Sequence, residues 1–403
     1  MVSLVFELAL KNLRRNTKRN LISSVAIIAA VFALIMGFGL VDGIDENTIR
    51  AQEDHLAGHV LLRPTGYPDD NRNFPLDQTQ PPPQSLDNNP EVLDYAERLF
   101  TRVRLIHQDQ SLRIKLLAHD IEQEDRVFIK DNWSVEGKWP NAPSEIGLGS
   151  GLAGLLELNV GDVVILEGRT KPGAINAQQY TVTSIVQTQN ASLDAFCAWL
   201  PMDNANNLLF FETARSHIAL KIKGGRTAAQ DFVDRFEDSE WQAFTAESEV
   251  ADLIAINRFR RKAISFISFI LMAIAATGIA NTIIMATYER IPEVGTVRAM
   301  GMQNRDVQLM FLLEGTIMGL LAGICGGLLG GALNYYLSYT GIDLSSKADT
   351  FGEVPIPTVI YTAFSMSQIL WSISFGLIVA LVASIWPAQH AVSIHPADAV
   401  RRH

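Results

Sequence analysis

Four long apolar stretches constrain the fold of this sequence more than any other feature. They run from Leu21 to Leu40, Ala263 to Tyr288, Gly315 to Tyr339 and about Phe364 to Trp386. A helix that crosses the apolar core of a bilayer needs about 20 such residues. Hydrophobic residues make up 48% of the 403-residue chain, and much of this apolarity is concentrated in the four stretches. We therefore predict a membrane protein with four transmembrane α-helices.

The first apolar stretch follows five basic residues, as the apolar core of a secretion signal would: Lys11, Arg14, Arg15, Lys18 and Arg19. A signal has an apolar core of only about 7 to 15 residues, followed by a cleavage site with small residues. The stretch here is longer and continues past Leu40 without such a site. We expect a retained helix rather than a cleaved signal.

The segment Phe6–Asn20 places Phe6, Leu10 and Leu13 on one side of a helix and basic groups on the other. This pattern is typical of an amphipathic helix at a membrane surface, although it also fits an ordinary basic flank.

The basic residues near the predicted helix ends indicate the orientation. Three groups of basic residues lie on one side of a four-helix topology: those before the first helix, Arg290, Arg298 and Arg305 between the second and third helices, and Arg401 and Arg402 at the end. Basic residues mark the cytoplasmic side. The region from about Val41 to Lys262 then faces outward with a net charge of about −12, against −10 for the whole chain. Such an acidic domain argues against a nucleic-acid partner.

This outward region is predicted to be an α+β domain of roughly 180 residues, which is enough to hold its own core. We expect strands at Gly58–Arg63, Leu112–Ala118, Asp162–Glu167, Tyr180–Gln187, Ala195–Leu200 and His217–Ile222, and helices at Pro90–Leu99, Leu152–Leu156 and Thr227–Phe236. Val41–Leu56 and Glu247–Arg260 continue the helical pattern and predict a stalk. Gly66–Pro90, rich in Pro, Asn, Asp and Gln, predicts a mobile loop.

Residues that could carry catalysis or bind a cofactor lack the necessary context. Gly149, Gly151 and Gly154 have the spacing of a dinucleotide fingerprint, but Glu157 follows too soon and a strand follows where the motif needs a crossover. His55 and His59 have the spacing of helical metal ligands without a third ligand. Cys197 and Cys325 are predicted to lie in different compartments and cannot form a disulfide. We expect no catalytic residue, cofactor or metal in this chain.

The segment after the second apolar stretch joins a charged part to a glycine-rich part. The charged part carries Glu289, Arg290, Glu293, Arg298, Arg305 and Asp306. The apolar part has glycines every four residues, at Gly315, Gly319, Gly323, Gly327 and Gly331. On a helix they form one stripe, and small residues allow a second membrane helix to approach closely. The stripe predicts a packing seam, which is compatible with a moving contact.

Glu314 marks the predicted start of the third span. It is either an interfacial residue at a helix N-terminus, where negative charge is favoured, or a polar latch to a neighbouring helix. Pro387 is predicted to end the fourth span.

Several motifs resemble the FtsX-type permeases of the MacB and LolC/LolE class of ABC transporters. They are ERIPEVGTVRAMG at Glu289–Gly301, FLLEG at Phe311–Gly315, WPA from Trp386 and HPADAVR up to Arg401. The opening LALKNLRRN and the outward segment Glu136–Leu166 are similar to the same class, and GHVLLRPTGY at Gly58–Tyr67 looks closest to LolE-like members. The resemblance covers essentially the whole chain.

The resemblance implies a MacB-like, type VII ABC permease fold in the inner membrane with a periplasmic α+β domain. Its parts would be an elbow helix (1–20), the first span and stalk (21–57), the periplasmic domain (58–245), a stalk and second span (246–288), a coupling-helix loop (289–313), the third span (314–340), a periplasmic loop (341–363), the fourth span (364–387) and a cytoplasmic tail (388–403). By motif match, Glu289, Glu293, Gly295, Arg298 and Gly301 would contact or shape the seat of an ABC ATPase subunit. That partner would bind the ATP in a separate chain.

The class also implies a second permease chain, identical or different, and a mechanical mechanism. Movement of the coupling helix would pass through the membrane helices to the periplasmic domain and move a substrate there. We expect a lipoprotein or hydrophobic substrate. The alternatives are efflux of antibiotics or peptides with a periplasmic adaptor, and FtsX-like regulation of a cell-wall hydrolase.

Overall fold

The computed structural model describes residues 7, 9, 11, 15, 17–68, 74–128, 130, 133–188, 190–211, 213–299, 301–343 and 359–393. The chain divides into two compact units. The helical unit comprises Met1–Ile44, Ala255–Ile342 and Tyr361–His403, and the sheet unit comprises Asp45–Ile254 and Asp343–Ile360. Most of the predicted elbow helix and residues 394–403 of the predicted tail lie outside the described residues.

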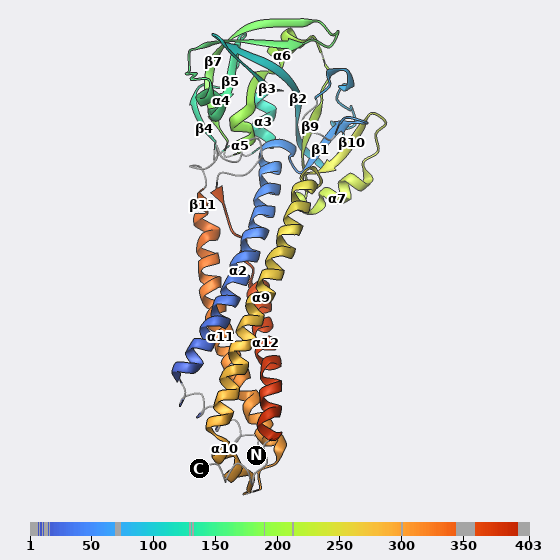
Figure 1. Cartoon of the computed structure of the whole chain (residues 1–403). Coiled ribbons are helices and arrows are strands. Elements are labelled where there is room, and N and C mark those ends of the chain that lie inside the picture. The colour runs from blue at the N-terminus through green and yellow to red at the C-terminus, as the bar shows by residue number, and fades with distance from the viewer. Residues whose placement is uncertain are drawn as a thin grey trace. The chain divides into compact units, whose positions relative to one another are not determined.

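In the described residues of the helical unit there are four long helices and one short one, and Figure 1 shows how they are arranged. The long helices are α2 (Thr17–Gln52), α9 (Ala251–Glu289), α11 (Asn304–Thr340) and α12 (Met366–Ser393), and the short one is α10 (Ile291–Ala299). Each long helix is apolar enough over 18 residues to cross a membrane. In lipid, a helix satisfies its own backbone hydrogen bonds, so an apolar run with many glycines remains helical.

Side chains from all four long helices form the core of this unit. Ile27 and Val31 of α2 pack with Met272 of α9, Phe311 of α11 and Ala380 of α12. Many large apolar side chains on the outer surfaces are exposed, among them Phe266, Phe269, Leu328 and Trp371. Such an apolar exterior suits lipid and would be unfavourable in water.

Pro387 does not end α12, contrary to the sequence prediction, because the helix continues to Ser393. A proline inside a helix loses one backbone hydrogen bond. The turns after it are held by packing, since Ala388 and Ala391 are buried in the helical core. Arg298 also donates a hydrogen bond to the Val392 carbonyl, 3.4 Å from its Nη1.

The sheet unit is built on a ten-stranded mixed sheet in the described part of the chain. Its order is β10-β1-β9-β2-β3-β8-β5-β7-β4, with β6 paired to β2 and β7. The strands are β1 (Val60–Pro64), β2 (Val92–His107), β3 (Gln110–His119), β4 (Ser134–Gly137), β5 (Glu145–Gly149), β6 (Val163–Arg169), β7 (Ile175–Gln187), β8 (Cys197–Pro201), β9 (His217–Ile222) and β10 (Trp241–Thr245). The β3–β8 and β5–β7 pairs are parallel, and the other pairs are antiparallel.

Short helices cover the sheet. They are η1 (Glu53–Ala57), η2 (Leu76–Gln78), α3 (Ile121–Val127), α4 (Ser150–Leu155), α5 (Ala191–Phe196), α6 (Met202–Leu209), α7 (Arg226–Arg235) and α8 (Ala246–Glu249). In Figure 1, α7 lies beside β10 at one end of the sheet, and α4, α5 and α6 lie at the other. The two short strands β11 (Ile342–Asp343) and β12 (Val359–Ile360) flank the undescribed residues 344–358.

The predicted helix at Pro90–Leu99 is wrong, because residues 92–99 belong to the long strand β2. Val92, Tyr95, Ala96 and Leu99 have helical spacing, which explains the error. Neighbouring strands pair with β2 on both sides, and this tertiary context overrides the local pattern.

The described part of the predicted mobile loop, residues 66–68 and 74–90, is held at several points. Trp241 Nε1 donates a hydrogen bond to the Pro81 carbonyl at 2.9 Å, Gln80 forms a β-bridge with Arg215, and Leu86 is buried. The prediction of a mobile loop is therefore wrong for this part. Residues 69–73 lie outside the described residues.

Candidate coupling segment and helix seams

The predicted coupling residues lie within α10, the short helix between α9 and α11, or within two residues of its ends. α9 ends at Glu289 and α10 begins at Ile291, so the chain turns at Arg290. After α10, Gly301 has a φ angle of +102°, which an L side chain rarely adopts, and no atom lies within 4 Å of the position a Cβ would take. Glycine at this position permits the turn into α11. α11 begins at Asn304, ten residues earlier than the predicted third span.

The five predicted residues do not form one cluster. Glu289 is exposed, Gly295 is buried, and Glu293 keeps about half its side chain exposed, at 53%. Glu293 accepts a hydrogen bond from Arg15 at 2.9 Å. Arg298 turns inward and donates to the end of α12. Glu289 and Glu293 therefore lie on the surface of this segment, whereas Arg298 makes an internal contact.

A buried ion pair joins the start of this segment to α11. Arg290 Nη1 lies 3.4 Å from Glu314 Oε2, and the two side chains are only 2% and 6% exposed. Removing either partner of a buried pair leaves an uncompensated charge, which costs about 3 to 5 kcal/mol. The geometry is that of a polar latch, the second of the two roles considered for Glu314. Arg290 was not among the predicted site residues, although its place beside Glu289 in the motif was visible.

The glycine stripe of α11 faces α12. A Cβ at Gly315 would collide with Ser384, one at Gly319 with the Ala380 methyl group, and one at Gly331 with Ile369. At Gly327 it would lie 2.6 Å from Ile373 Cδ1, and at Gly323 it would make an ordinary 3.5 Å contact with Ile373 Cγ2. The closeness of the two helices therefore varies along the stripe and is greatest near Gly315 and Gly319.

α11 has a second close contact that the sequence analysis missed. Gly326 faces α2, where a Cβ would lie 2.8 Å from the Ile28 carbonyl oxygen. Gly330 faces the same helix at Phe32 and Ile35. These two glycines repeat the four-residue spacing of the first stripe one position earlier, so the signal was present in the sequence.

Residues 37–43 of α2 contact each of the other long helices or the chain leading into them. Gly37 and Gly39 allow close approach by Ile264 of α9 and Asn334 of α11. Asp42 accepts hydrogen bonds from both Arg261 of α9 and Gln368 of α12. This convergence was also missed, because residues more than 200 positions apart form it.

The glycine-rich and histidine patterns that resembled binding motifs have structural uses. A Cβ at Gly149 would collide with carbonyl oxygens of α5, including that of Leu193, so this glycine permits helix packing. His55 Nδ1 accepts a hydrogen bond from Trp133 Nε1 at 3.0 Å, and His59 Nδ1 accepts one from the Ile222 amide at 3.2 Å. Among the described residues, no group of three or more His, Cys, Asp or Glu side chains is placed to hold a metal ion.

Comparison with known proteins gives one family match and several relatives of nearly full length. Residues 265–396 match the FtsX-like permease C-terminal family. This range contains most of α9, the whole of α10, α11 and α12, and therefore both partners of the buried ion pair.

The relatives include the lipoprotein-releasing system transmembrane proteins LolE of Haemophilus influenzae and LolC of Neisseria meningitidis. LolE is 23% identical over 94% of this chain and 94% of its own length. LolC is 23% identical over 100% of both chains. The macrolide export ATP-binding/permease protein MacB of Psychrobacter arcticus is 23% identical over 98% of this chain and 59% of its own length.

Among solved structures, the periplasmic region of MacB from Actinobacillus actinomycetemcomitans aligns with 51% of this chain at 12% identity and a TM-score of 0.34. Residues 265–396 therefore match an FtsX-like permease C-terminal domain, and the relatives that align over 94% or more of this chain include LolE, LolC and MacB.

Proposed function

We propose that this protein is the permease subunit of an ABC transporter that releases lipoproteins or other hydrophobic substrates from the outer face of the bacterial inner membrane. ATP would be bound and hydrolysed by a separate ATPase subunit seated on α10. A second permease chain, identical or different, would complete the transporter. The sheet unit would lie in the periplasm.

The main support is the end-to-end similarity to LolC and LolE. These two permeases align over 100% and 94% of their own lengths, whereas MacB aligns over 59% of its length. The similarity favours a permease of the Lol type. Macrolide or peptide export is the second candidate, since MacB matches this chain at the same 23% identity.

The arrangement around α10 supports its role as the ATPase seat. Glu289 and Glu293 are exposed on a short segment that the buried Arg290–Glu314 pair and the Arg298–Val392 contact hold to the helical unit. A push on this segment would reach α11 directly. Movement transmitted through helix contacts needs no charged pathway across the bilayer.

Glu293→Arg tests the seat. We expect this variant to lose co-purification of the ATPase subunit in detergent, because the reversed charge lies on the exposed contact surface. Glu293 and Arg15 are both more than half exposed, so losing their pair should cost no more than about 1 kcal/mol of stability. Glu136→Arg is the matched control, an exposed charge reversal on β4.

Arg298 is less suitable for this test, because its contact with the Val392 carbonyl makes any effect ambiguous. If Glu293→Arg and the control bind the ATPase equally well, the assignment of α10 is wrong. The substrate class is tested in proteoliposomes that contain both subunits. ATP-dependent release of a triacylated protein supports lipoprotein release, and ATP-dependent macrolide movement without it supports export.

A further inference from the structure

The first turns of the membrane part of α9 carry an unusual concentration of positive charge. Arg258, Arg260, Arg261 and Lys262 are all exposed, at the end of α9 opposite to α10. Basic residues near membrane helices are expected mainly on the cytoplasmic side, which in the proposed orientation is the α10 end. Four cations at the other end therefore suggest a local use for positive charge.

Three of these cations share one face of the helix. Arg258, Arg261 and Lys262 are spaced i, i+3 and i+4, and Ser265 follows at i+7 on the same face. Arg260 points elsewhere and donates a hydrogen bond to Asn257 Oδ1 at 2.7 Å. We call Arg258, Arg261 and Lys262 the basic face of α9.

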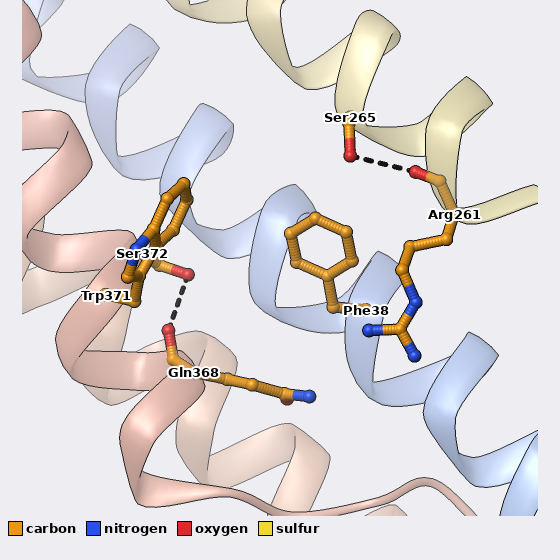
Figure 2. A pocket seen from close by; sticks show the side chains of 6 residues that line it. All are labelled: Phe38, Arg261, Ser265, Gln368, Trp371 and Ser372. Carbon is orange, nitrogen blue, oxygen red and sulfur yellow. Dashed lines mark hydrogen bonds between the residues drawn. The ribbon is translucent and has the colours of Figure 1, made fainter. Parts of the chain in front are cut away.

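A pocket adjoins the basic face at Arg261 (Figure 2). It has a volume of about 260 Å³ and is lined by Phe38, Arg261, Ser265, Gln368, Trp371 and Ser372. Figure 2 shows the Phe38 ring of α2 between the Arg261 side chain of α9 and the Trp371 side of α12. The pocket thus combines aromatic walls with a guanidinium group.

The polar groups of the pocket keep some capacity to bind a ligand. The Ser265 and Ser372 hydroxyls donate to carbonyls of their own helices, at 2.9 and 2.7 Å, so their oxygens can still accept. Gln368 donates to Asp42, while its buried Oε1 has no hydrogen-bond partner among the described residues. A buried acceptor without a partner has the capacity to accept a hydrogen bond from a bound ligand.

We propose that the basic face of α9 and this pocket bind an anionic phospholipid of the surrounding bilayer. The phosphate lies against Arg261 with Arg258 and Lys262 nearby, and the upper part of an acyl chain lies along Phe38 and Trp371. A headgroup hydroxyl, as in phosphatidylglycerol, supplies the donor for Gln368 Oε1. Complete ligands occupy pockets of about 300 to 1,000 Å³, so a pocket of about 260 Å³ fits one part of a lipid whose remainder stays in the bilayer.

The expected depth of the pocket residues in the membrane agrees with a bound phospholipid. Arg261 and Lys262 directly precede the apolar run of α9, which begins at Ala263, and Trp371 lies near the beginning of α12. Tryptophan and the ends of basic side chains concentrate where the acyl region meets the headgroups. This inference rests on the membrane placement in the proposed function, but it does not depend on the substrate or the ATPase.

Quenching of Trp371 fluorescence by brominated phospholipids tests the proposal. Of the six tryptophans, only Trp371 and Trp386 lie in the long helices, so Trp386→Phe leaves Trp371 as the membrane reporter. The full chain is placed in bilayers that contain equal fractions of phosphatidylglycerol and phosphatidylcholine, with either one brominated. We expect a preference for phosphatidylglycerol on the order of fivefold, which corresponds to about 1 kcal/mol for one basic residue near an anionic headgroup.

Matched variants identify the source of the preference. Arg261→Gln combined with Asp42→Asn removes both partners of the ion pair, which avoids leaving a lone charge, and should abolish the preference. Arg258→Gln with Lys262→Gln keeps that pair and should reduce the preference. Arg260→Gln removes a cation from the same turn but a different face and should change nothing. Trp371→Phe, which leaves Trp386 as reporter, should show no preference.

Equal quenching by the two lipids, or an equal loss of preference in the Arg260 variant, would overturn the lipid site while leaving the membrane placement intact. Quenching by neither lipid would overturn both. If a brominated triacylated peptide quenches Trp371 more strongly than brominated phosphatidylglycerol does, the pocket binds the transported lipid anchor. That result would refute a bilayer phospholipid as the occupant.

Discussion

Gly319→Ala should separate α11 from α12, whereas Gly323→Ala, one turn along the same stripe, should be tolerated. The new methyl group at residue 319 would overlap the Ala380 methyl group. An alanine methyl is fixed to the backbone and cannot rotate away, so the two helices must move apart. At residue 323 the new methyl group would lie 3.5 Å from Ile373 Cγ2, an ordinary contact distance.

The two variants should change the free energy of unfolding differently. Overpacking a close contact costs about 1 to 3 kcal/mol, and replacing glycine by alanine in a helix returns at most about 1 kcal/mol. With the full propensity gain, the net effect of Gly319→Ala is a loss of up to about 2 kcal/mol. Gly323→Ala keeps the helix-propensity gain without the overlap, so its effect should be neutral or slightly stabilising.

Thermal unfolding in a mild detergent measures this difference. With a sensitivity of about 2 to 4 °C per kcal/mol for units of 150 to 250 residues, Gly319→Ala should lower Tm by a few degrees, and Gly323→Ala should leave it unchanged or raise it. The double variant Gly319→Ala/Ala380→Gly restores the space and should recover much of the loss. Equal Tm values for the two single variants, or no recovery in the double variant, would refute the packing argument.

Three further outcomes follow from buried groups and the turn after α10. In chemical denaturation, Glu314→Gln should lower the free energy of unfolding by about 3 to 5 kcal/mol, because the buried Arg290 loses the charge of Glu314. Glu293→Gln, which changes an exposed pair, should lower it by less than about 1 kcal/mol. Burial lowers the pKa of His55 and His119 to about 4 from an ordinary value of 6.5. Between these two pH values the unfolded chain binds more protons than the folded chain, so the free energy of unfolding should be highest above pH 6.5. It should fall towards pH 4 by up to ~1.4 kcal/mol per pH unit for each histidine. His119→Gln should flatten this slope as followed by tryptophan fluorescence, and an unchanged slope would contradict the assignment. Gly301→Ala, at a φ angle of +102°, should destabilise the turn by about 1 kcal/mol and weaken ATPase binding, whereas Gly278→Ala, a helical position with open space around it, should do neither.

Local periodicity correctly predicted the elements whose tertiary contacts favour the same secondary structure as their local sequence. The four apolar stretches correspond to α2, α9, α11 and α12, and the strand predicted at His217–Ile222 has the bounds of β9. The same reasoning failed at residues 90–99, where helical spacing of apolar residues occurs in a strand that pairs on both sides. A periodicity shows which residues share a face, but it does not show what the face will meet.

The contacts that define the candidate site depend on what meets those faces. The glycine spacing indicated a close contact along α11, yet only the structure shows that α12 makes this contact and that α2 makes another at Gly326 and Gly330. The Arg290–Glu314 and Asp42–Arg261 pairs join residues that are 24 and 219 positions apart. A single sequence carries no record of such pairings, because each residue alone fits an exposed position near a helix end.

These contacts make α11 the central element of the helical unit. Its two glycine faces differ by one residue, or about 100° around a helix, and they pack against α12 and α2 respectively. Glu314 directly precedes Gly315 and joins α11 to Arg290, at the beginning of the candidate coupling segment. Because close-packed helices transmit displacement with little compression, we expect any movement of α11 to displace α12 and α2 as well. We infer that α2 receives the movement through Gly326 and Gly330, so bulk added at these positions should impair coupling even where ATPase binding is normal.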